Sequence, residues 1–171
     1  MKSKGFTLLF AVLIASVLLS VALAIFSQMY KTLLLSSASK ESLAAFYAAD
    51  SGVECVLYWD LKHDGFPDGI FATSSKSVDY KESDSISCDD QEFTKTVNGW
   101  LVTEKTSISA TTNFNLSFTT GGSLPTEGCT EVTVSKTVNS DETVFTTVES
   151  RGYNICADSP RKVERAVRVT Y

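Results

Sequence analysis

The sequence is poor in histidine and in the motifs that most enzyme sites require. His63 is the only histidine among 171 residues, so a Ser-His-Asp or Cys-His arrangement would have to use this one residue. The chain also lacks a phosphate-binding glycine loop and an HExxH helix. We therefore expect no enzyme activity, no catalytic residues and no required cofactor.

Basic residues are also scarce. Lysine and arginine number 15 against 20 aspartate and glutamate, which gives a formal charge of −5. Contacts to nucleic-acid phosphates need lysine and arginine, so we expect no nucleic-acid partner. The main basic cluster lies near the C-terminal end, and we interpret it as a solvated strand face: Arg161, Lys162, Arg165 and Arg168.

Charge is missing altogether from residues 6–30, whereas Lys2 and Lys4 directly precede this segment. About 25 uncharged, mostly apolar residues in a helix are long enough to cross a membrane. The lysines predict that the N-terminal end stays cytoplasmic and that the rest of the chain is exported. A secretory signal would have a shorter apolar core, followed by a cleavage site. The segment therefore predicts a single membrane span over 6–30.

Helix-breaking residues are rare in the next segment. Residues 31–61 contain no proline, and Gly52 is their only glycine. Apolar residues recur there at steps of three and four, which predicts an amphipathic continuation of the same helix: Leu43, Phe46, Tyr47, Val53 and Leu57. An amphipathic helix must pack against another element.

Residues 62–171 form the predicted exported head. Apolar and polar residues alternate over five stretches, which predicts half-buried antiparallel strands near 97–105, 113–119, 130–138, 143–153 and 163–171. The stretch 72–92 is expected to be a loop with room for one short strand. One face of such a sheet needs a cover, and the amphipathic helix can supply it. The expected fold is therefore α+β, with a long N-terminal helix packed on an antiparallel sheet.

Four cysteines, Cys55, Cys88, Cys129 and Cys156, follow the apolar segment, and no CxxC motif occurs. An even number of cysteines in an exported domain indicates disulfides. Three pairings are possible. We favour Cys55–Cys88 with Cys129–Cys156, and four buried free thiols remain the alternative.

Acidic residues gather in two predicted loops. The first holds Asp60, Asp64 and Asp68, and these are weak candidates for a calcium site. The second runs over 79–90. Neither loop has the EF-hand spacing, so a solvated acidic surface is the favoured interpretation and no metal site is predicted.

The stretch Lys4-Gly5-Phe6-Thr7-Leu8, followed by the long helix, resembles the N-terminus of type IV pilins and pseudopilins. In that family a prepilin peptidase cuts after the glycine and methylates the new N-terminal phenylalanine. The resemblance covers about the first 60 residues. It implies a leader of residues 1–5 and a cut between Gly5 and Phe6. The apolar helix would then stay in the membrane before assembly and in the filament core afterwards.

A second stretch, AAFYAADSGVE at residues 44–54, resembles the AxYAAExG helix segment of PilX-like minor pilins. An alanine-rich face that packs closely on a sheet explains the same residues, and both interpretations can hold together. Gly52 is unfavourable inside a helix by up to about 1 kcal/mol relative to alanine. A packing or bending role for Gly52 is therefore expected.

One departure from the family pattern lies at Phe10. Major pilins usually carry glutamate at the fifth position counted from Phe6, and that carboxylate can pair with an N-terminal ammonium. A buried charge is tolerated when it has such a partner. Phe10 cannot provide it, so the resemblance implies a minor, tip-associated or priming subunit. The alternative is that Phe10 is simply one more lipid-facing residue.

Together these features predict a minor pilin or pseudopilin, a structural subunit of a type IV pilus or of a type II secretion-like filament. Its implied partners are a prepilin peptidase, other pilin subunits, the inner-membrane assembly platform and membrane lipid. It would lie in the inner or cytoplasmic membrane and then in a surface or periplasmic filament. The alternative is a single-pass, membrane-anchored binding protein or adhesin that never polymerises.

Overall fold

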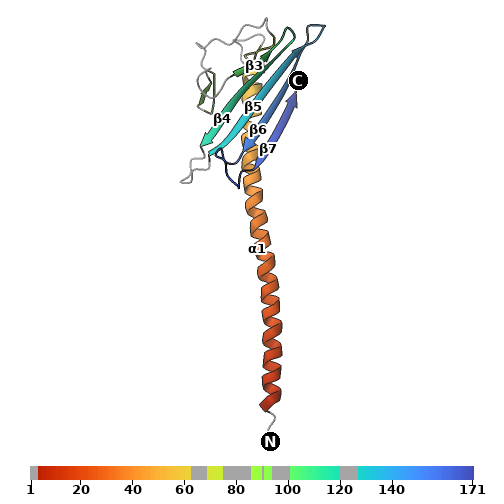
Figure 1. Ribbon diagram of the computed structural model, residues 1–171, viewed down its shortest axis with the longest axis vertical. Coiled ribbons are helices and arrows are strands. Elements are labelled where there is room, and N and C mark those ends of the chain that lie inside the picture. The colour runs from red at the N-terminus through yellow and green to blue at the C-terminus, as the bar shows by residue number, and fades with distance from the viewer. Residues whose placement is uncertain (1–3, 63–68, 75–85, 90, 94–100, 120–126) are drawn as a thin grey trace. The chain divides into compact units, whose positions relative to one another are not determined.

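The computed structural model describes residues 4–62, 69–74, 86–89, 91–93, 101–119 and 127–171 (Figure 1). Contacts within the chain divide it into two compact units, Met1–Lys40 and Glu41–Tyr171. The first unit contributes a helical segment whose side chains from residue 6 to residue 40 are all exposed. The second unit contains the sheet and the core.

One α-helix, α1, runs from Lys4 to Leu57, and a π-helical turn, η1 (Tyr58–Lys62), continues it. This confirms the prediction of a single helix that reaches about residue 61. Side chains become buried only in its C-terminal part, beginning at Ala45. The helix therefore has an exposed stretch and a stretch that packs, as predicted. The predicted packing stripe is wrong in its first half, because Leu43, Phe46 and Tyr47 are 52%, 43% and 59% exposed. The small residues Ala45, Ala48 and Ala49 are buried instead, and the predicted stripe reaches the core only at Val53 and, partly, at Leu57.

The sheet has five antiparallel strands in the order β3-β4-β5-β6-β7. All five strands predicted from alternation are present: β3 (Leu101–Lys105), β4 (Ser109–Thr119), β5 (Glu127–Val138), β6 (Val144–Tyr153) and β7 (Glu164–Thr170). Each strand pairs with the next in sequence. The expected α+β layout, a long helix with an antiparallel sheet, is confirmed.

A separate two-stranded ribbon consists of β1 (Ile86–Cys88) and β2 (Gln91–Phe93). The sequence predicted a loop here with room for one short strand, so the second strand is a difference. Both strands are only three residues long. Period-two alternation cannot be recognised over such a short length.

The core lies between the C-terminal part of α1 and one face of the sheet (Figure 1). The helix contributes Val53 and Val56, and strands β4, β5 and β6 contribute the apolar side chains Phe114, Leu116, Val132, Val134 and Val148. Phe71 also belongs to the core, with its ring stacked on Phe114 at a centroid distance of 6.0 Å. Because Phe71 lies outside any regular element, the sequence pattern did not predict its burial.

Small residues allow the helix to approach the sheet closely. Gly152 on β6 faces the helix backbone, and a Cβ atom there would collide with the carbonyl oxygen of Ala45 and the amide nitrogen of Ala49. A Cβ on Gly52 would collide with the Ser150 side chain. The expected packing role of the alanine-rich stretch and of Gly52 is therefore confirmed.

Candidate functional site: the N-terminal helix and the disulfide-linked ribbon

Gly5 and Phe6, the residues of the predicted cleavage junction, lie in the first turn of α1. This turn has no acidic residue, although carboxylates stabilise the positive end of the helix dipole. The first described turn therefore lacks the carboxylate that would stabilise this end of the helix.

Phe6 and Phe10 lie one turn apart on the same side of α1. Their side chains are 71% and 54% exposed, and their rings stack at a centroid distance of 6.4 Å. Position 10 therefore presents an apolar ring to the surroundings. No carboxylate is available there to pair with an amino group.

Three hydroxyl side chains of the exposed helical stretch donate to carbonyl oxygens of the helix itself. Ser16 and Ser20 donate to the carbonyl oxygens of Leu13 and Val17, each at 2.8 Å. Thr32 makes the same kind of bond to the carbonyl of Gln28 at 2.6 Å. Hydroxyl groups bonded in this way do not need water. The helix is long enough and apolar enough to span a membrane.

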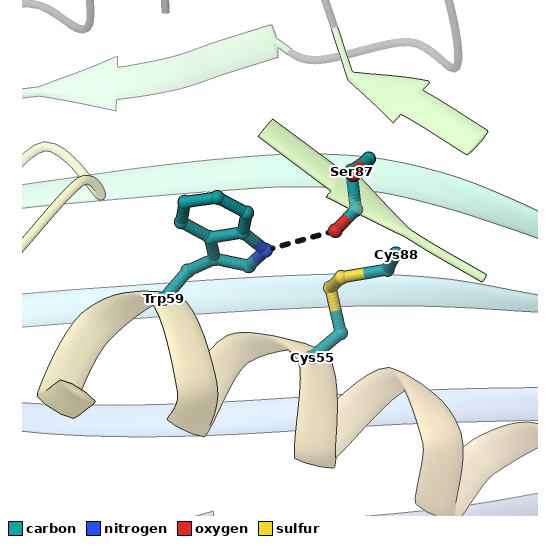
Figure 2. Close-up of a disulfide and its surroundings, with 4 residues drawn as sticks. All are labelled: Cys55, Trp59, Ser87 and Cys88. Carbon is teal, nitrogen blue, oxygen red and sulfur yellow. Dashed lines mark hydrogen bonds between the residues drawn. A yellow bond between two sulfur atoms is a disulfide. The ribbon is translucent and has the colours of Figure 1, made fainter. Parts of the chain in front are cut away.

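At the other end of α1, a disulfide joins Cys55 on the helix to Cys88 on β1 (Figure 2). This confirms one of the two favoured pairings. Trp59, one turn further along, donates from its indole nitrogen to the carbonyl oxygen of Ser87 at 3.1 Å. Two adjacent residues of β1 are thus attached to two adjacent turns of the helix.

The ribbon is also attached to the sheet. The Gln91 side-chain oxygen accepts hydrogen bonds from the Ser117 amide at 3.0 Å and from its hydroxyl at 3.2 Å, and the Gln91 amide group donates to the Ser117 carbonyl. Among the described residues, the pairs between β3 and β4 reach only Asn113, before Ser117. The Gln91 side chain bonds both backbone polar groups of Ser117, as a neighbouring strand would.

The structure contains no disulfide between Cys129 and Cys156, whose side chains are both half-buried. The second favoured pairing is therefore not confirmed. The register places Cys129 opposite Tyr153, three residues before Cys156. Both cysteines thus belong to the same end of the sheet.

Asp60, the first of the weak calcium candidates, is already engaged by protein groups. Its side chain is 3% exposed, and Lys136 donates to one carboxylate oxygen at 2.6 Å. The Tyr171 hydroxyl donates to the other oxygen at 2.8 Å. Burial, together with the Asp60 carboxylate, raises the pKa of Tyr171. Asp60 therefore joins the C-terminal end of the helix to Lys136 on β5 and to Tyr171, which follows β7.

The remaining calcium candidates, Asp64 and Asp68, lie outside the described residues, as does most of the second acidic loop. Asp89 from that loop is described, and it has a positive φ of 51°. Within the described ranges, no group of three or more histidine, cysteine, aspartate or glutamate residues is arranged to hold a metal ion.

The basic cluster is exposed, as expected, but it does not form one strand face. Two of its residues, Arg161 and Lys162, precede β7, and Arg165 and Arg168 lie three positions apart in β7, on opposite faces of the sheet. Arg161, Lys162, Arg165 and Arg168 all carry exposed side chains. Lys162 lies 4.2 Å from the centre of the Tyr153 ring, and Arg165 donates to the Ser42 hydroxyl at 2.8 Å. These contacts attach part of the cluster to the head without burying its charge.

Comparisons with known proteins do not assign the chain to a family. No protein-family model, curated protein or solved structure matches it.

Proposed function

We propose that the chain is a minor pilin or pseudopilin, a structural subunit of a type IV pilus or a type II secretion-like filament. The observation that carries this proposal is the position of the Lys4-Gly5-Phe6 stretch at the start of α1. The same helix carries a fully exposed apolar segment and ends in the layer that covers the sheet. A prepilin peptidase cut after Gly5 would leave helix and head joined.

The exposed apolar segment requires a covering environment. Large side chains such as Leu8, Leu19 and Phe26 are each more than 60% exposed. An exposed apolar surface of this extent is typical of membrane or protein contact. Lipid would cover it in the unassembled subunit, and the corresponding helices of other subunits would cover it in a filament.

Phe10 supports a minor role within the filament. A subunit with phenylalanine at this position offers no carboxylate to the amino group of a neighbouring subunit. It would therefore add poorly to copies of itself and take a tip or priming position. Formation of long filaments by this chain alone would contradict the tip assignment without affecting the proposed processing.

The test is co-expression with a prepilin peptidase, followed by mass measurement of the intact protein. We expect loss of residues 1–5 and the added mass of one methyl group on Phe6. The variant Gly5→Leu should remain uncut, because its side chain blocks the junction. Leu9→Ile, which leaves the junction unchanged, should be processed normally. A chain that keeps Met1 when the peptidase is active would favour the membrane-anchored binding protein instead.

A further inference from the structure

A pocket of about 430 Å³ opens beside the disulfide, between the C-terminal end of the helix, the β1–β2 ribbon and β4. Its volume lies within the range of roughly 300–1,000 Å³ that is usual for small-molecule sites. Cys55 and Leu116 are its most buried lining residues and form the floor. All of its lining residues belong to the compact unit Glu41–Tyr171.

The pocket walls are held in place by one disulfide and by hydrogen bonds at two places. The Cys55–Cys88 disulfide and the Trp59–Ser87 hydrogen bond fix the ribbon to the helix (Figure 2). The Gln91 side chain fixes the ribbon to Ser117 on β4. A pocket whose walls are already fixed needs little ordering when a ligand binds, which favours affinity.

Two aromatic rings form one side of the pocket. Tyr58 and Trp59 meet edge to face, with ring centroids 5.5 Å apart and planes at 89°. The Tyr58 side chain is 56% exposed, so its ring is accessible to a ligand. Phe118 adds a third, half-buried ring. The faces of such rings attract cations, and methylated ammonium groups are the ligands for which proteins use this arrangement most clearly.

The charge of the pocket selects among ligand classes. Glu54 and Asp89 line it with exposed carboxylates, and none of its described lining residues is basic. Two carboxylates disfavour an anion. A neutral sugar would gain binding free energy from contact with the rings but none from the carboxylates. A cation would gain binding free energy from both.

We propose that this pocket binds a small organic ammonium cation, with the methylated ammonium against the Tyr58 and Trp59 rings and its charge near Glu54 and Asp89. Its lining residues lie outside the exposed apolar stretch on which the proposed filament function rests.

The probe is choline, titrated calorimetrically into the full-length protein in micelles of a polyoxyethylene alkyl ether, which carries neither a choline group nor a sugar. The matched ligand is 3,3-dimethyl-1-butanol, which has the same shape as choline but no charge. We expect saturable binding of choline, about tenfold tighter than binding of the alcohol. Equal binding of the two ligands, or no saturable binding of choline, would overturn the proposal.

Variants locate the binding to this pocket. Glu54→Gln and Asp89→Asn remove one charge each with little change in shape, and asparagine tolerates the positive φ at position 89. We expect each to weaken choline binding about three- to tenfold. Tyr58→Phe should retain binding because it keeps the ring, and Tyr58→Leu should weaken it. Asp158→Asn, an exposed acid outside the pocket, should have no effect.

Circular dichroism of each variant shows whether the fold is retained. Unchanged choline affinity in folded Glu54→Gln and Tyr58→Leu would refute the assignment. Tighter binding of methyl glucoside than of choline, lost in the same variants, would also refute it and would indicate a sugar site.

Discussion

Asp60 and Lys136 show how far the role of a single residue depends on its partner. In the sequence, Asp60 starts an acidic, glycine-containing loop, and Lys136 interrupts an alternating strand. In the structure both side chains are 3% exposed and form an ion pair across 76 residues of sequence. Neither partner can be predicted from its local pattern, because alternation indicates which face a residue occupies but not which charged residue lies opposite.

Removing Lys136 should destabilise the head strongly. In Lys136→Met the Asp60 carboxylate remains buried without its cation, and a broken buried pair typically costs about 3–5 kcal/mol. We expect a loss of this size in the free energy of unfolding, measured by urea titration of the full-length protein in uncharged detergent.

The control is the double variant Asp60→Asn/Lys136→Met, which removes both charges. It should be less destabilised than the sum of the two single variants, because no unpaired charge stays buried. Additive losses would show that the pair does not act as a unit.

Tyr171 should make the head sensitive to alkaline pH. Burial, and then the Asp60 carboxylate, raises its pKa above the ordinary value of about 10. The folded state therefore holds the proton more tightly than the unfolded state. The contribution of protonated Tyr171 to the free energy of unfolding is fully present below about pH 10. It is lost as the pH rises through the folded-state pKa.

Urea unfolding at pH 8 and pH 11 measures this effect. The free energy of unfolding should fall less between the two pH values in Tyr171→Phe than in the unchanged chain. Tyr153 also has a raised pKa, of about 12, because of burial and Glu131. It is present in both chains and therefore contributes the same fall in stability to each. The same fall with and without Tyr171 would contradict the prediction.

At the scale of elements, the sequence predicted what regular periodicity can reveal. The change from an uncharged run to a three- and four-residue repeat predicted the long helix, and alternation predicted β3 to β7. The Cys55–Cys88 bond was a favoured pairing and one short strand was expected near it, but the second strand of the ribbon and the burial of Phe71 were not predicted. Both depend on long-range contacts that no local pattern reveals, the Gln91–Ser117 hydrogen bonds and the stacking on Phe114.

The contact between the helix and β6 should tolerate no added side-chain atom at Gly152. A Cβ there meets backbone atoms of Ala45 and Ala49, which cannot rotate away. Overpacking of this kind typically costs about 1–3 kcal/mol and occasionally more. We expect Gly152→Ala to lower the free energy of unfolding by at least this amount in the same urea assay.

Gly128→Ala on the neighbouring strand is the matched control. Its Cβ would lie 3.3 Å from the carbonyl oxygen of Tyr153, a tight contact that a small shift can relieve. It should therefore be clearly less destabilising than Gly152→Ala. Equal effects would mean that the helix can move away from the sheet.

For the whole molecule, the central question is whether the apolar part of α1 lies in lipid. Leu18 is near the middle of this segment and is 64% exposed. In Leu18→Arg, a charge at the centre of a span should cost about 2.5–3.5 kcal/mol on membrane-insertion scales. We expect a clear drop in the fraction that stays with the membrane after alkaline carbonate extraction, whereas Leu18→Ala should stay membrane-bound.

Since the head begins to pack only at Ala45, the disulfide should form in both variants once they are exported. Equal retention of Leu18→Arg and Leu18→Ala in the membrane fraction would show that this stretch is not the span, and the proposed filament subunit would lose its anchor.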